Sequence, residues 1–264
     1  MARFEVKDGY GIIPAGSFKI SDNAFFGCND MTSIDIPSSV REIGHQSFEE
    51  CSNLKNIEIP ESVEVIGKYV FRGCTGLEKI DVSPKNRYYE SRARCSMVPT
   101  NCNAIIEKAS NTLIYGCQNT VIPSSVAVIG PAAFYHCTGL KKIDMPESVK
   151  VIEAYAFVDC KGLTELEFPD DVMRIRDGAF LGCTGLKSIV FRGDVMKIED
   201  RAYSGCTGLT RIEFHGEVMK IAHDAFDECD SLEQILVPMD TAFSYKQLLP
   251  NKYHRLIEEV HFSD

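Results

Sequence analysis

The chain has 264 residues, of which 44% are hydrophobic, and a formal net charge of −10. This length and apolar content allow a sizeable buried core in one or two domains. The acidic balance and the lack of a basic face argue against nucleic-acid binding, and the sequence contains no apolar run of the roughly 18 residues that a membrane-spanning helix needs.

The N-terminal residues are charged and lack the apolar stretch of a signal peptide. We therefore expect a cytoplasmic location for the chain as it stands, with a cell-surface or secreted location as the alternative if a signal peptide has been removed. Phe4 and Val6 precede the turn sequence KDGYG, which predicts a β-hairpin. We expect residues 1–12 to cap the repeats that begin at residue 13.

From residue 13 the sequence repeats with a step of 23 residues. Isoleucine, phenylalanine or tyrosine, and leucine columns follow this step, and so do the cysteines at 28, 51 and 74 and at 137, 160, 183, 206 and 229. Self-similarity at such a period is typical of repeat proteins, in which each unit buries its apolar side only by stacking on its neighbours.

Each unit contains two short segments joined by tight bends. In residues 54–60, apolar Leu54, Ile57 and Ile59 are placed as in a β-strand, and Pro60 ends the pairing. Residues 63–71 space their apolar side chains by three to five, which predicts an irregular or 3₁₀-like return path. We therefore predict one mainly β solenoid domain over residues 1–264, with a parallel strand face and regular repeats over 13–81 and 122–237.

An irregular repeat interrupts the array over residues 82–121. Cys74 and Cys137 are 63 residues apart, which is 17 more than the 46 of two periods. Apolar residues 104–106 and 113–115 flank a polar turn, so we predict an inserted β-hairpin that projects from the solenoid.

Three cysteines of the irregular repeat, Cys95, Cys102 and Cys117, lie off the 23-residue grid. If the hairpin turn centres on residues 109–110, Cys102 and Cys117 lie opposite each other and could form a disulfide. A one-residue change of register removes this possibility, and we favour free thiols because no signal peptide is present.

The repeat pattern changes after residue 237, and we expect residues 238–264 to form a helical C-terminal cap. Asp240 or Thr241 can cap a short helix that ends near Leu249. Asn251 can cap a second helix, whose apolar face would carry Tyr253, Leu256, Ile257 and Val260.

The units IPSSVREIGHQSFEECSNLKNI and IPSSVAVIGPAAFYHCTGLKKI, the irregular repeat and the tail ILVPMDTAFSYKQLLP resemble the BspA-like leucine-rich repeat family over nearly the whole chain. The resemblance implies a right-handed, curved leucine-rich repeat solenoid of bacterial type. It also implies a binding protein, often at a cell surface, without catalytic residues.

The residues themselves show no catalytic, cofactor or metal motif. Phosphate-binding, zinc-protease, nucleophile-elbow and Cys-x-x-Cys patterns are missing. Thiols that point the same way from successive coils do not converge on a metal, and free cysteine packs as a small hydrophobic residue. We therefore expect the cysteine column to be structural, and we expect neither a cofactor nor an enzyme activity.

The candidate binding surface is formed by the side chains that alternate with the buried ones on the strand face. One outward column is acidic at six of its positions: Asp35, Glu58, Asp81, Asp144, Glu167 and Glu213. The neighbouring column is mixed and contributes Lys79, Lys142 and Arg211. These nine residues form either a solvated, solubilising face or a docking stripe for a basic partner.

A second feature is the recurrence of Met173, Met196 and Met219, each followed by a basic residue. We expect these methionines to fill the core or pack against neighbouring side chains rather than to form a contact strip.

The predicted function is non-enzymatic binding of an unidentified protein or glycan on the strand face. The alternative is a self-assembling structural or adhesion protein.

Overall fold

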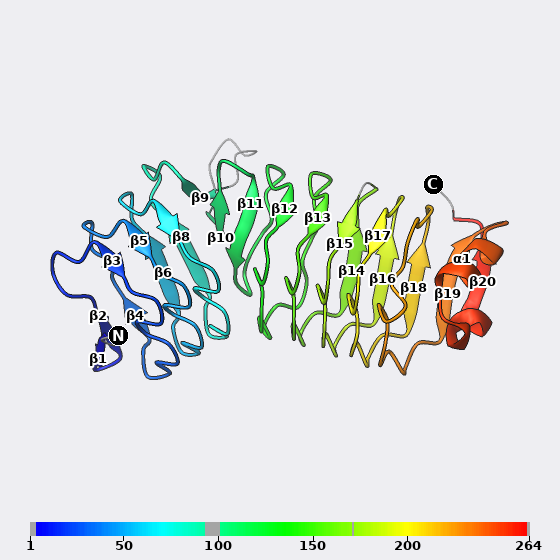
Figure 1. The fold of residues 1–264 in the computed structure, drawn as a ribbon, viewed down its shortest axis with the longest axis horizontal. Helices are drawn as coiled ribbons and strands as arrows, with labels where there is room; N and C mark the ends of the chain where they lie inside the picture. Colours follow the sequence, from blue (N-terminus) through cyan, green and yellow to red (C-terminus); the bar gives the residue numbers. More distant parts are fainter. Residues whose placement is uncertain (1–3, 93–100, 171, 263–264) are drawn as a thin grey trace.

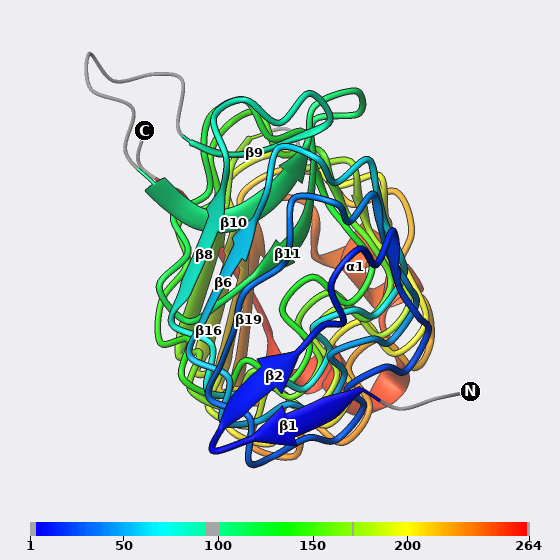
Figure 2. The ribbon, with the colours of Figure 1, turned by 90° about the vertical axis from the view of Figure 1, so that its left-hand side faces the viewer.

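The computed structural model describes residues 4–92, 101–170 and 172–262. They form a mainly β solenoid of about 11 turns with a short C-terminal helix, as predicted. The coils stack side by side along the long axis of the molecule (Figure 1). Seen along that axis, their strands superpose on one side of the stack (Figure 2).

One strand from almost every coil forms the strand face. Its members are β2 (Tyr10–Ile12), β4 (Ser33–Ile34), β6 (Asn56–Ile59), β8 (Lys79–Val82), β14 (Glu165–Phe168), β16 (Ser188–Phe191), β18 (Arg211–Phe214), β19 (Gln234–Pro238) and β20 (Ile257–Val260). The pairing is parallel within three ladders, β2–β4, β6–β8 and β14 to β20. It keeps the 23-residue step, as in Glu165 opposite Ser188, except between β19 and β20, where Ile235 lies opposite Ile257. Side chains of these strands alternate between the core and solvent because successive residues of a strand point to opposite faces.

The return path is more regular than the irregular segment expected from the sequence. It opens with two-residue strands that pair in parallel: β3 (Lys19–Ile20), β5 (Glu42–Ile43), β7 (Val65–Ile66), β12 (Val128–Ile129), β13 (Val151–Ile152), β15 (Arg174–Ile175) and β17 (Lys197–Ile198). The backbone pairing continues in the bend that follows each return strand.

Each bend except the last, where only Glu228 is left-handed, contains two residues with left-handed backbone, four positions apart. In one coil they are Gln46 (φ 56°) and Glu50 (φ 60°). This conformation turns alternate N–H groups toward the next coil, where the amide of Phe48 donates to the carbonyl of Val70 at 3.1 Å. Glycine occupies the second position in four coils, at residues 27, 73, 182 and 205, because it adopts positive φ without strain.

Aromatic rings stack through the core at the same 23-residue step. Ring centroids are 5.4 Å apart for Phe25 and Phe48, and 4.7 Å apart for Phe134 and Phe157. The column is broken between Phe71 and Phe134, where the irregular repeat separates two hydrophobic clusters.

The inserted hairpin exists, but the expectation that it projects from the solenoid is wrong. Strands β9 (Tyr89–Arg92), β10 (Asn101–Glu107) and β11 (Thr112–Gly116) pair antiparallel, and β11 then pairs parallel with the return strand β12. Ala104 and Ile106 pack into the C-terminal cluster, whereas Ile105 and Tyr115 pack into the N-terminal one. The hairpin is apolar on both faces, and it is therefore buried as a partition between two cores.

Tyrosine hydroxyls of the partition bond backbone groups of the preceding coil. The hydroxyl of Tyr115 accepts from the amide of Val70 at 2.8 Å and donates to the carbonyl of Gly67 at 2.9 Å. Its ring packs edge-on against Phe71, with the centroids 5.3 Å apart. The hydroxyl of Tyr89 accepts from the amide of Ile66 at 3.0 Å.

The two ends of the solenoid are covered by the chain itself. The predicted N-terminal hairpin is confirmed, with β1 (Glu5–Lys7) antiparallel to β2. The first predicted C-terminal helix is also confirmed as α1 (Ala242–Leu248).

The second predicted C-terminal helix is wrong. A 3₁₀ turn (Asn251–Leu256) leads instead into β20, which pairs parallel with β19. The backbone of β19 gains hydrogen-bond partners in this way, which the predicted helix would not supply.

We predict that Gly116→Ala lowers the free energy of unfolding by about 1–3 kcal/mol. A methyl group at this position would overlap the ring of Phe134, the first ring of the C-terminal stack. Urea denaturation measures the effect. Introduced into a Phe134→Leu background, the same substitution should cost clearly less, because the overlap is relieved. An unchanged stability of Gly116→Ala would show that Phe134 does not pack on the partition.

Candidate functional site

The nine residues predicted for binding all lie on the outer side of the strand face. Seven of them, Asp35, Glu58, Lys79, Lys142, Asp144, Glu167 and Arg211, are exposed, while Asp81 and Glu213 are half-buried. The alternation of inward and outward positions is thus confirmed for these strands. Leu236 of β19, which pairs with Glu213 and continues the outward column, is buried instead.

Most of the acidic side chains already have partners within the chain. Asp81 accepts from the hydroxyl of Ser91 at 3.0 Å, and Asp35 accepts from the phenol of Tyr10, whose pKa is raised mainly by this hydrogen bond. Glu213 lies 2.8 Å from Arg211 and 3.1 Å from His215. The acidic column is therefore not a continuous stripe of free carboxylates.

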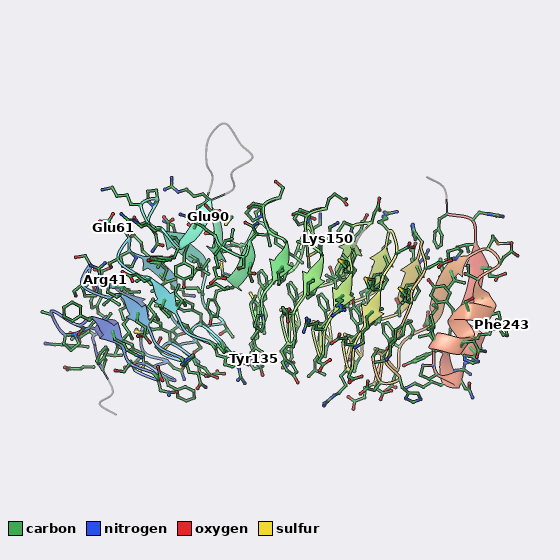
Figure 3. All side chains as sticks on the ribbon, turned by 45° about the horizontal axis from the view of Figure 1, so that its top comes forward. Arg41, Glu61, Glu90, Tyr135, Lys150 and Phe243 are labelled. Carbon is green, nitrogen blue, oxygen red and sulfur yellow. The ribbon has the colours of Figure 1, made fainter. Side chains whose placement is uncertain are left out.

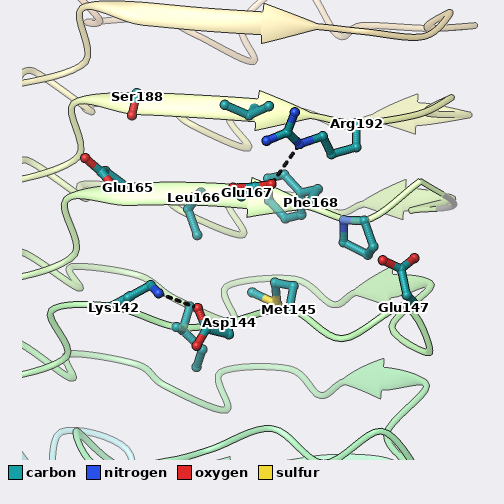
Figure 4. Close-up of a pocket in the computed structure, with 13 residues that line it drawn as sticks. Lys142, Asp144, Met145, Glu147, Glu165, Leu166, Glu167, Phe168, Ser188 and Arg192 are labelled. Atoms are coloured by element: carbon teal, nitrogen blue, oxygen red, sulfur yellow. Dashed lines mark hydrogen bonds and ion pairs between the residues drawn. The ribbon is translucent and has the colours of Figure 1, made fainter. Parts of the chain in front are cut away.

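The structure brings three of the nine residues together at a groove in the strand face. Residues 141–145 run beside β14 without forming a strand, and β14 is the edge strand of a five-stranded sheet. The resulting groove has a volume of about 380 Å³ and lies between Lys142 and Asp144 on one side and Glu167 on the other (Figure 4).

The groove is apolar at its base and charged along its rim. Leu166 and Phe168 of β14 are buried beneath it. The rim carries four carboxylates (Asp144, Glu147, Glu165 and Glu167) and two bases (Lys142 and Arg192). Lys142 pairs with Asp144 at 2.9 Å and Arg192 with Glu167 at 2.7 Å, so two of the carboxylates have a basic partner on the rim.

Three charged residues of the rim, Glu147, Glu165 and Arg192, were not among the predicted site residues. Glu165 belongs to the mixed outward column, so the alternation of the strand was the signal that could have identified it. Six predicted residues, Asp35, Glu58, Asp81, Lys79, Arg211 and Glu213, do not line this groove.

The cysteine column is structural in its geometry. The thiols of Cys51, Cys74, Cys160, Cys183, Cys206 and Cys229 each donate to the carbonyl of the aromatic residue 26 positions earlier, at 3.0–3.3 Å. Burial raises the pKa of Cys160 well above its usual value, which keeps the thiol protonated and unreactive. Among the described residues, no three histidine, cysteine or acidic side chains are placed to hold a metal ion.

Cys102 and Cys117 are both free and buried. A bulge between Ile105 and Ile106 shifts the hairpin register by one residue, so the two thiols are not opposite each other. Burial raises the pKa of Cys102 to about 12. Cys95 lies outside the described residues.

The methionine positions differ from the expectation of core filling. Met173, Met196 and Met219 are 44%, 40% and 73% exposed. Each lies beside a return strand of the C-terminal half, and together they form an exposed strip on the side away from the strand face.

The helices of the described ranges are too short or too polar to cross a lipid bilayer.

No functionally curated protein matches the chain. The family model described as "BspA type Leucine rich repeat region (6 copies)" matches residues 10–120 and 105–233.

Three of the solved structures that resemble this fold illustrate the similarity. A leucine rich cell surface protein from Faecalibacterium prausnitzii is 31% identical, with a TM-score of 0.69; the match covers 84% of this chain and 58% of that protein. A leucine-rich repeat protein from Eubacterium ventriosum (21% identical, TM-score 0.60) matches over 85% of this chain and 71% of its own length. The pneumococcal vaccine antigen PcpA is 19% identical, with a TM-score of 0.64; the match covers 92% of this chain and 67% of that protein. The last two support the fold alone.

We predict that the buried column thiols react slowly with a thiol reagent such as DTNB in the native protein, and that denaturation makes all 11 cysteines react. Both burial and the bond to a carbonyl oppose thiolate formation. Peptide mapping after brief labelling should find Cys51, Cys160, Cys183 and Cys206 unmodified. Fast modification of these four under native conditions would contradict a structural role.

Proposed function

The chain belongs to the BspA-type leucine-rich repeat family, and from this premise we propose that it is a non-catalytic binding module. The strand-face groove would hold an extended, basic segment of a partner protein. The family's repeats are typically non-catalytic, which supports a binding role over an enzymatic one. The match spans 58% of the Faecalibacterium relative.

The observation that carries this proposal is the edge of β14, along which residues 141–145 run without forming a strand, beside a cluster of carboxylates. Backbone N–H and C=O groups at a sheet edge can pair with an added strand. Four carboxylates against two bases on the rim favour a positively charged segment. The exposed rings and aliphatic groups that a partner needs for affinity are limited here, so we expect a moderate, salt-dependent interaction.

A cell-surface location follows from the same premise as a proposal. The Faecalibacterium relative is a cell surface protein, which supports the surface alternative over the cytoplasmic expectation. A partner would then be an extracellular protein that presents lysine or arginine residues in an extended segment.

Self-assembly is the second candidate, and the exposed methionine strip supports it. Methionine adapts to irregular contact surfaces, and Met219 is 73% exposed. Two copies could bury these strips against each other. Sedimentation velocity of the intact chain distinguishes the candidates, because a concentration-dependent dimer that Met219→Gln abolishes would favour self-assembly.

We predict that a fluorescent peptide of about ten alternating lysine and serine residues binds the groove, and that Glu165→Lys combined with Glu147→Lys weakens binding at least about tenfold. Fluorescence anisotropy at low and moderate salt measures the affinity. Neither carboxylate has an ion-pair partner among the described residues, so these substitutions should leave the fold intact.

The matched control is Asp35→Lys combined with Glu58→Lys, which makes the same change of net charge on the strand face outside the groove. The proposal requires this control to lose at most a few-fold in affinity. Equal losses in both double variants would mean that the peptide responds to net charge rather than to the groove.

A further inference from the structure

The bend edge of the solenoid is open at the irregular repeat. In a regular coil, the amides of Gln46, Phe48 and Glu50 donate to carbonyls of the next bend. The equivalent amides one coil later belong to Tyr69, Phe71 and Gly73, and no described residue accepts a hydrogen bond from them. The hairpin supplies strands but no bend, so one bend is missing from the stack.

The opposite wall of this gap carries unused acceptors. By the same 23-residue register, the carbonyls of Pro131, Ala133 and Tyr135 should accept from a preceding bend. Ala133 accepts from the amide of Gly116 at 2.9 Å, whereas the carbonyls of Pro131 and Tyr135 have no donor among the described residues. The gap thus presents donors on one side and acceptors on the other.

Three tyrosines line a recess of about 270 Å³ within this gap, together with an arginine and an alanine. Tyr69 and Arg72 come from one wall, and Ala132, Tyr135 and Tyr155 from the other. Tyr69 and Tyr155 are 36% and 43% exposed. The ring of Tyr155 lies against the bare backbone of Gly178, where a Cβ atom would come within 2.8 Å of it. Tyr135 lies at the junction of the two stretches of coils (Figure 3).

The position that a cationic ligand would take is already filled. The guanidinium carbon of Arg72 lies 4.2 Å from the centroid of the Tyr135 ring and 5.9 Å from that of Tyr69. One of its nitrogens donates to the hydroxyl of Tyr135 at 3.2 Å, and another lies 3.4 Å from the buried carboxylate of Glu49. The recess therefore offers neither an empty cation cage nor an unbalanced positive charge for an anion.

We propose that this recess binds a neutral pyranose unit of a glycan. A sugar ring has a flat C–H face that packs on tyrosine rings. Its hydroxyl groups both donate and accept, which matches the free amide of Tyr69 on one wall of the recess and the free carbonyl of Tyr135 on the other. The volume falls just below the range of about 300–1,000 Å³ typical of drug-sized ligands, so it suits one ring rather than a large ligand. This site is separate from the strand-face groove and does not depend on the function proposed for it.

The test uses the full chain labelled with 3-fluorotyrosine, whose ten tyrosines are followed by fluorine NMR. The probes are the methyl glycosides of glucose, galactose, mannose and N-acetylglucosamine, with choline and glucuronate as charged comparisons. We expect at least one neutral glycoside to shift the signals of Tyr69 and Tyr155 saturably, while Tyr245 and Tyr253 at the C-terminus stay unchanged.

The variant Tyr155→Asn should weaken that binding at least about tenfold, a loss in line with the removal of an aromatic stacking surface. Asparagine tolerates the left-handed backbone at this position, and thermal unfolding checks that the fold is kept. The control Tyr88→Asn removes another exposed tyrosine, which does not line the recess, and should bind as the parent does.

Four outcomes would overturn the proposal. The first is a shift caused by choline or glucuronate but by no neutral glycoside. The second is the lack of any saturable shift at Tyr69 and Tyr155 with all four glycosides, and the third is unchanged affinity in Tyr155→Asn. A fourth is selective binding of a short extended peptide, for example Gly-Asn-Gly-Asn, at these tyrosines without glycoside binding, which would assign the recess to a polypeptide instead.

Discussion

The constraint on which this structure depends is that each coil satisfies the polar backbone groups of its neighbour. A single unit has no internal sheet, so its amides and carbonyls need partners in the next coil. Strands, return strands and bends all pair at the same 23-residue step. The column cysteines serve the same constraint, because each buried thiol donates to a carbonyl of an adjacent coil.

The irregular repeat meets this constraint along the return strands and leaves it unmet at the bends. Its β11 continues the return-strand sheet through β12, and Tyr115 and Tyr89 supply hydroxyl groups to the coil before it. The bend edge receives no equivalent, which leaves the aromatic recess. Both candidate sites therefore lie where the regular pairing of coils fails: the groove at the free edge of β14 and the recess at the missing bend.

Much of the fold could be predicted because its columns are visible in the sequence. The period, the outward positions such as Glu58 and Lys142, and the existence of the hairpin all follow from spacing alone. Ala104, Ile105 and Ile106 are apolar in succession, which indicates two buried faces rather than one and hence a buried hairpin. The groove and the recess could not be predicted, since they depend on which backbone pairs fail to form, and no residue type signals that failure.

The most direct test of how the irregular repeat meets this constraint is native-state hydrogen exchange at the amide of Val70 in the Tyr115→Phe variant. The ring is kept and only the hydroxyl that bonds this amide and the carbonyl of Gly67 is lost. We predict faster exchange at Val70 than in the parent chain, and a free energy of unfolding lower by about 1–3 kcal/mol, because buried groups lose their partner. Unchanged protection of Val70 would contradict the claim that the tyrosine hydroxyl bridges these two backbone groups, whose equivalents bond each other directly in other coils, as the amide of Ala133 does to the carbonyl of Gly130.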